Sequence, residues 1–148
     1  MTPNLNNYDI IYSLQRFFAD TFDIRAVWLS DGDSYPAERP FITLEYITDE
    51  RIDRVKNREA VQVIEHLQLG YHALNIVDRT KRAESIADAL TFNKIPYYNT
   101  TKSLEQSDGF FRVRVTSVVP MPASEASRHS EYHRVYFDVE IEKIKRGC

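Results

Sequence analysis

The chain has 148 residues, of which 43% are hydrophobic and 28% charged, and its 19 basic and 22 acidic side chains leave a net charge of −3. This composition predicts a single soluble domain, residues 1–148, whose core needs no disulfide. It argues against nucleic-acid binding as the main task, because no strong basic field is present. No apolar run is long enough to predict a membrane-spanning helix. The single cysteine, Cys148, favours a reducing compartment, and the N-terminal sequence lacks a signal-peptide pattern.

The N-terminal part of the chain predicts a helix followed by two strands. Apolar residues recur at spacings of three and four over Asn6–Thr21, which indicates an amphipathic helix with Asn6 or Asn7 as its N-cap. Ile24–Ser30 and Phe41–Thr48 are rich in β-branched and aromatic residues, and the segment between them has the composition of a loop.

The middle of the chain predicts a long strand and a second helix. Ala60–Ile76 alternates between apolar and polar residues, as expected of a half-buried strand. The period then changes to that of a helix over Thr80–Phe92, with Asp78 or Thr80 as its cap. The following segment is expected to be extended because it contains Pro96.

The C-terminal part predicts a hairpin, Phe111–Ile144, with a polar loop at about 120–131. Its two core faces are expected to consist of Phe111, Val113, Val115 and Val119 and of Val135, Phe137, Val139 and Ile141. The opposite face would bring Arg112, Arg114 and Thr116 across from Asp138, Glu140 and Glu142. Two interpretations stay open: a solvated face whose charges neutralise one another, or a subunit interface.

These elements together predict an α+β fold. Its mostly antiparallel sheet would carry two main amphipathic helices on one face. A charged hairpin arm, at about 49–59, would project from the sheet.

The predicted arm, Asp49–Glu59, contains four acidic and four basic residues but no glycine for a tight turn. It is either a solvated hairpin end or an arm that becomes ordered against a partner, and the second alternative favours assembly over catalysis. The candidate interface residues of the arm and the hairpin are Arg51, Asp53, Arg54, Lys56, Arg58, Arg112, Arg114, Asp138, Glu140 and Glu142.

Catalytic and metal-binding patterns are missing from the sequence. His129 and His133 have the spacing of a zinc site only on a helix, His66 and His72 stand about 20 Å apart on a strand, and all four histidines are expected at the surface. No nucleophile elbow or phosphate-binding glycine loop occurs. The sequence therefore predicts no enzyme activity, no catalytic residue, no cofactor and no metal.

In the order and residue patterns of its elements, the chain resembles the tail-terminator (tail-completion, or neck) proteins of long-tailed bacteriophages. The resemblance rests on the N-terminal helix, the strands "FITLEYIT" and "AVQVIEHLQLGYHAL" with the charged arm between them, the helix "TKRAESIADALTF", the edge "IPYYN" and the final hairpin ending "VYFDVEIEKI". It covers nearly the whole chain but includes no invariant motif.

The resemblance implies a structural virion protein without catalytic activity. Such subunits form a ring, commonly of six, that closes the tail tube and meets the head connector. The implied partners are further copies of the chain, the tail tube protein and a connector or head-completion protein. The implied location is the tail or neck of a virion, after synthesis in the cytoplasm of the host bacterium. The resemblance makes Asp49–Glu59 and the loop Pro120–Ser130 candidate contact regions.

Two other classes of function compete with this hypothesis. The first is a small ligand-binding or hydrolytic α+β domain with a cleft near Gly109 and Pro120. The second is an adaptor that binds nucleic acid through Arg51, Arg54, Lys56 and Arg58. The acidic residues interleaved with these cations weaken the second, because they would repel phosphate.

Overall fold

The computed structural model describes residues 5–29, 36, 38–53, 60–120 and 133–146. Within these residues the elements are α1 (Asn7–Phe22), β1 (Arg25–Trp28), β2 (Phe41–Asp53), β3 (Ala60–His72), α2 (Ile76–Phe92), β4 (Ile95–Pro96), β5 (Phe110–Phe111), β6 (Arg114–Pro120) and β7 (Arg134–Arg146). No helix in this part of the chain is long and apolar enough to cross a membrane.

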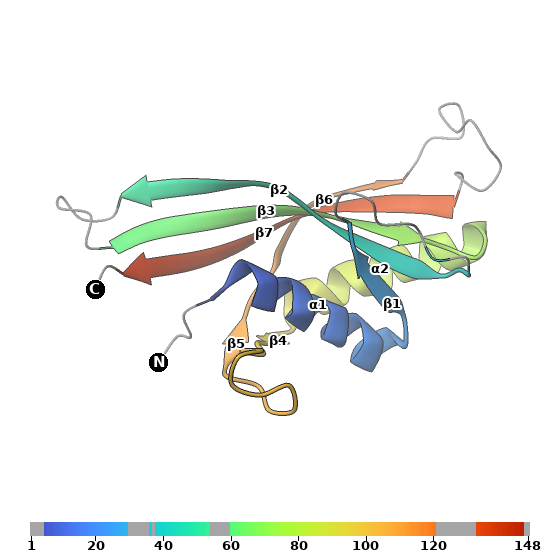
Figure 1. Cartoon of the computed structure of the whole chain (residues 1–148). Helices are drawn as coiled ribbons and strands as arrows, with labels where there is room; N and C mark the ends of the chain where they lie inside the picture. The colour runs from blue at the N-terminus through green and yellow to red at the C-terminus, as the bar shows by residue number, and fades with distance from the viewer. Residues whose placement is uncertain (1–4, 30–35, 37, 54–59, 121–132, 147–148) are drawn as a thin grey trace.

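The main sheet has five strands in the order β1-β2-β3-β7-β6. β1 runs parallel to β2, and the other neighbouring strands are antiparallel. Both helices lie on the same face of this sheet, and β4 and β5 form a small second sheet below it (Figure 1). The predicted α+β fold, with a mostly antiparallel sheet and two helices on one face, is confirmed.

Helix α1 forms where the apolar spacing predicts it. Asn6 caps its N-terminus, because its side chain accepts hydrogen bonds from the amides of Tyr8 and Asp9. The helix ends at Phe22, and its C-cap Asp23 adopts the left-handed conformation with φ of 55°. The apolar face is buried against the sheet through Ile10, Ile11, Leu14, Phe17 and Phe18.

Helix α2 begins four residues earlier than the sequence pattern predicts, and β3 correspondingly ends at His72. Asn75 is the N-cap, because its side-chain oxygen accepts the amide of Asp78 at 2.8 Å. The predicted caps have other roles: Asp78 accepts the amide of Leu74, and the Thr80 hydroxyl donates to the Ile76 carbonyl.

The apolar alternation of β7 is confirmed, since Val135, Phe137, Val139 and Ile141 are all buried. The first strand of the hairpin departs from the prediction in two ways. Phe111 belongs to the small sheet with β4, and Val119 is 48% exposed. A shift of register between Val115 and Ser117 accounts for the second difference, because it moves the later residues of β6 to the other face.

The end of the main sheet extends beyond the helices (Figure 1). At this end β2 is paired with β3 as far as Asp53 opposite Val61, and β3 is paired with β7 as far as Ala60 opposite Arg146. We call this three-stranded part, residues 45–53, 60–66 and 141–146, the projecting ribbon. It contains the first part of the predicted arm, and the remainder of the arm, residues 54–59, lies outside the described residues.

Candidate assembly surface

The predicted interface residues fall into three places. Arg51 is exposed on the projecting ribbon and lies 3.4 Å from the carboxylate of Asp49. Asp53 ends β2, whereas Arg54, Lys56 and Arg58 lie outside the described residues. The others belong to the predicted hairpin. Arg112 precedes β6 and Arg114 begins it, and Asp138, Glu140 and Glu142 lie on β7.

The arginines and carboxylates of the predicted ladder are only partly in register. Arg114 is in register with Glu140 on the neighbouring strand. Asp138, in contrast, accepts a hydrogen bond from the Ser117 hydroxyl at 2.7 Å, because the bulge places serine beside it. Arg112 precedes β6 and is therefore not a member of the ladder.

On the helix-free face of the sheet, His66 lies between two carboxylates, Glu50 and Glu140. His66 Nε2 lies 3.0 Å from Glu50 Oε1, and His66 Nδ1 lies 3.7 Å from Glu140 Oε1. The sequence places His66 on a polar face but does not show these two partners. They come from strands on either side of β3, so only the register of the sheet brings them together.

Two exposed isoleucines, Ile52 and Ile144, lie close to the end of the ribbon; we call them the apolar row. Ile52 and Ile144 both pair in register with Gln62 on the central strand. They are 43% and 51% exposed. Both isoleucines therefore lie on the outer strands of the ribbon, with much of their apolar surface in contact with solvent.

On the other face, a buried ion pair attaches the ribbon to the start of α1. Lys143 Nζ lies 3.1 Å from Glu65 Oε1, and the two side chains are 3% and 2% exposed. Lys143 also donates to the Leu5 carbonyl at 3.3 Å and to Asn7 Oδ1 at 2.5 Å. Burial lowers the pKa of Lys143, while the hydrogen bond and the charge of Glu65 act in the opposite direction.

The sequence contains a signal for this buried pair: a charged residue at an apolar position of each of the two strands. Glu65 occupies an apolar position of its strand, between Val63 and Leu67. Lys143 follows Ile141 on the core side of β7 in the same way. A single charge in an otherwise apolar alternation indicates a buried, paired group, because an isolated charge is costly to bury.

His72 corrects the prediction that the histidines lie on the surface. It is 1% exposed and stacks on Phe41, with ring centroids 4.3 Å apart. Burial, together with the positive charges of Arg134 and Arg39, lowers its pKa to about 3. His72 is therefore a neutral core residue at physiological pH.

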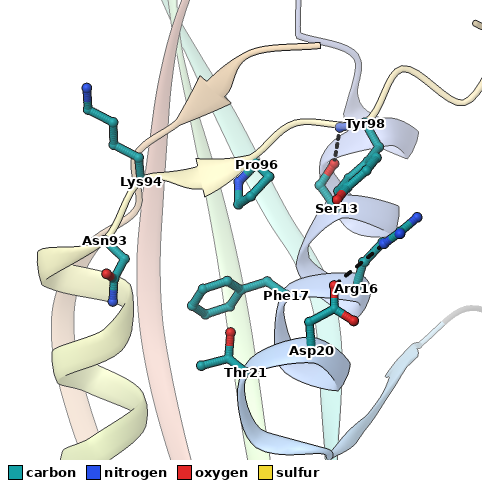
Figure 2. A pocket seen from close by; sticks show the side chains of 9 residues that line it. All are labelled: Ser13, Arg16, Phe17, Asp20, Thr21, Asn93, Lys94, Pro96 and Tyr98. Atoms are coloured by element: carbon teal, nitrogen blue, oxygen red, sulfur yellow. Dashed lines mark hydrogen bonds and ion pairs between the residues drawn. The ribbon is translucent and has the colours of Figure 1, made fainter. Parts of the chain in front are cut away.

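A cleft of about 280 Å³ opens between α1, the end of α2 and β4 (Figure 2). It differs from the predicted cleft, since neither Gly109 nor Pro120 lines it. Its charged lining residues are Arg16, Asp20 and Lys94. The Arg16 side chain already lies 4.4 Å from the ring centre of Tyr98 and 3.6 Å from Asp20. It also donates to the Leu104 carbonyl. The volume is just below the range of typical small-molecule sites.

Ser13 is similarly engaged at the edge of the cleft. Its hydroxyl donates to the Asp9 carbonyl at 2.6 Å and accepts the amide of Tyr98 at 2.9 Å. This geometry is that of a structural link between α1 and the segment after β4. Among the described residues, no three His, Cys, Asp or Glu side chains are close enough to hold a metal ion.

No protein-family model matches this chain, and no curated protein matches it.

Proposed function

We propose that the protein is a structural subunit of a phage tail or neck, similar to tail terminators, and that it assembles as a ring. The ring would close the tail tube and present its other side to the head connector. The projecting ribbon is the observation that carries this proposal. It combines exposed isoleucines and charges of both signs on strands that extend past the helical layer.

Such a ribbon is costly to expose unless a partner covers it. Strand edges and apolar side chains at the surface promote pairing with other chains, and natural proteins usually shorten or cover them. The buried Lys143–Glu65 pair holds the ribbon against α1. A ribbon attached to the domain in this way is suited to present a defined surface to a neighbouring subunit.

The test is the oligomeric state of the purified full chain. Light scattering over a range of concentrations, followed by electron microscopy, should show closed rings, and six subunits is the number implied by the resemblance. Mixed with tail tubes, the protein should be found at tube ends. A monomer at every concentration, with no binding to tube ends, would contradict the proposal.

The charges of the arm provide a more specific experiment. We expect Arg54→Glu together with Arg58→Glu to leave the fold intact and to block ring formation, because reversing two charges of the arm would disturb its charge match with a neighbour. Lys81→Glu with Lys94→Glu is the matched control on exposed positions outside the arm. Ring formation by the arm variant at the wild-type concentration would remove the arm from the interface.

The cleft beside Arg16 favours a second candidate function, the binding of a small ligand by a solitary domain. The guanidinium on an aromatic ring and the apolar side chains of Phe17 and Pro96 are features of such sites. A thermal-shift screen of small anions should then stabilise the wild type but not Arg16→Ala. A protein that forms rings and shows no such shift excludes this candidate.

A further inference from the structure

Among the described residues, the projecting ribbon has two strand edges without a neighbouring strand. β1 covers the outer edge of β2 only at Phe41–Leu44. β6 covers the outer edge of β7 only as far as Glu140. Within the part of the chain that the structure describes, no strand pairs with the outer side of β2 over 45–53 or of β7 over 141–146. The backbone groups along these stretches can hydrogen-bond to another strand.

The directions of the two edges fit a ring. β2 and β7 both run antiparallel to β3 and are therefore parallel to each other. A rotation about an axis along the strands keeps strand direction, so it would place β2 of one copy parallel to β7 of the next. Pairing of two unlike edges is the heterologous contact that closes a ring.

The formal charges of the two edges are opposite. The free stretch of β2 contains four acidic residues and one basic residue: Glu45, Asp49, Glu50, Asp53 and Arg51. The free stretch of β7 contains three basic residues and one acidic residue: Lys143, Lys145, Arg146 and Glu142. Lys143 is already paired with Glu65, so Lys145 and Arg146 provide the attraction. Two copies of β2 would repel each other, which disfavours a two-fold dimer through that edge.

The apolar row supports the same contact. Ile52 is on the β2 edge and Ile144 is on the β7 edge, at the same level of the ribbon. Each is about half exposed in the single subunit. A second copy placed edge to edge would cover both isoleucines.

We propose that the free edge of β2 pairs, in parallel, with the free edge of β7 of a second copy of this chain, so that the main sheet continues from subunit to subunit. This inference rests on the proposed ring function and specifies its contact. The ladder supplies backbone hydrogen bonds, and the opposite charges decide which edges meet. A strand contributed by a different protein is the competing occupant.

A charge-swap experiment on the full chain tests this pairing. The first variant, Asp49→Lys with Glu50→Lys, makes the β2 edge basic. The second variant, Lys145→Glu with Arg146→Glu, makes the β7 edge acidic. Each variant alone should need an about 100-fold higher concentration than wild type to form rings, because like charges then face each other. Glu84→Lys with Asp88→Lys, at exposed positions of α2, is the matched control and should assemble normally.

Mixing the two variants should restore rings of even number. The first variant then has two basic edges and the second has two acidic edges. Every contact between unlike variants joins a basic edge to an acidic one, so a ring of alternating copies can close. Circular dichroism of each variant checks that the domain remains folded.

The outcomes separate this inference from the proposed function. If wild type forms rings and both variants do so equally well, or if the mixture fails to recover, the edge pairing is wrong while the ring function stands. If wild type forms no rings and binds no tube ends, the proposed function itself is overturned. If wild type is monomeric but binds another protein through these edges, the occupant is a foreign strand and the proposed self-pairing is wrong.

Discussion

Lys143 and Glu65 lie in an environment that their chemical type does not suggest. Lysine and glutamate are rarely buried completely, yet both are here almost without solvent contact. Their attraction and the hydrogen bonds to Leu5 and Asn7 offset the cost of removing two charges from water. The pair links the sheet to the first helix and therefore orients the projecting ribbon.

Lys143→Met should lower the free energy of unfolding by about 3–5 kcal/mol, because it leaves the Glu65 carboxylate buried without its partner. Combining it with Glu65→Met should recover most of this loss, since no uncompensated charge then remains. Urea denaturation of the two variants and wild type measures both effects. A double variant as unstable as the single one would show that the ion pair itself, rather than the orphaned charge, determines stability.

His72 predicts a dependence of stability on pH. Its pKa is about 3 in the folded protein and 6.5 in the unfolded chain, so below pH 6.5 the unfolded chain binds a proton that the folded protein does not. The stability of the wild type should therefore fall as the pH decreases from 6.5 towards 3, by up to about 1.4 kcal/mol per pH unit.

His72→Phe should flatten this slope while retaining the stacking on Phe41. Thermal unfolding between pH 7 and pH 4 gives the comparison, because in roughly this window His72 becomes protonated in the unfolded chain but stays neutral in the folded protein. His66→Gln serves as the control and should keep the acid slope that His72 contributes. Equal slopes for His72→Phe and wild type would refute this role of His72.

At the scale of elements, the boundary between β3 and α2 is decided by competition among polar side chains. The sequence pattern predicts Asp78 or Thr80 as the helix cap, whereas the cap in the structure is Asn75. Asn75 caps the first turn, while Asp78 bonds both the Leu74 amide and the Tyr71 hydroxyl. Because Asn75 accepts the first-turn amide and Asp78 is bonded to groups that precede the helix, the helix begins earlier than its apolar periodicity indicates.

Asn75→Ala should destabilise the protein by about 1 kcal/mol, because the amide of Asp78 loses its acceptor. Thr80→Ala, at the position that the sequence favours as a cap, should change stability by less than about 0.5 kcal/mol. Chemical denaturation of the two variants compares them directly. A larger effect at Thr80 than at Asn75 would contradict the observed cap.

For the whole molecule, the arrangement of layers determines which surface is available for assembly. The two helices cover one face of the sheet but do not reach the end that forms the projecting ribbon (Figure 1). The helices thus provide the core, and the long strands β2, β3 and β7 provide the surface that extends beyond it. The ribbon therefore exists because these three strands are longer than the helical layer that covers them.

Hydrogen exchange should detect the assembly of the ribbon. In the free subunit, amides of β3 within 63–69 should exchange slowly, because that strand has a neighbour on both sides. The outward-pointing amides of β2 within 45–52 should exchange quickly, and they should become protected when rings form. Mass spectrometry of free and assembled protein provides the measurement, with α2 as an internal control. Unchanged exchange in β2 on ring formation would argue against its edge as the contact.

The local pattern of the sequence was sufficient for much of the fold. The apolar spacing in α1 and the strict alternation in β7 identify both elements and their buried faces, because each periodicity permits only one side to be covered. Of the predicted arm, the structure describes residues 49–53, which belong to β2, and residues 54–59 lie outside the described part. Of the candidate residues of the hairpin, Arg114 and Glu140 lie on the predicted strands, whereas Arg112 precedes β6.

By itself, then, the sequence determined the fold class and the buried faces of its clearest elements, because these depend on the spacing of apolar side chains along one segment. Only the tertiary structure decided the parallel pairing of β1 with β2, the bulge that exposes Val119, the clamp of His66 between two carboxylates and the buried Lys143–Glu65 pair. Each of these depends on the register between strands distant in the chain, and strand register is a property of the assembled sheet.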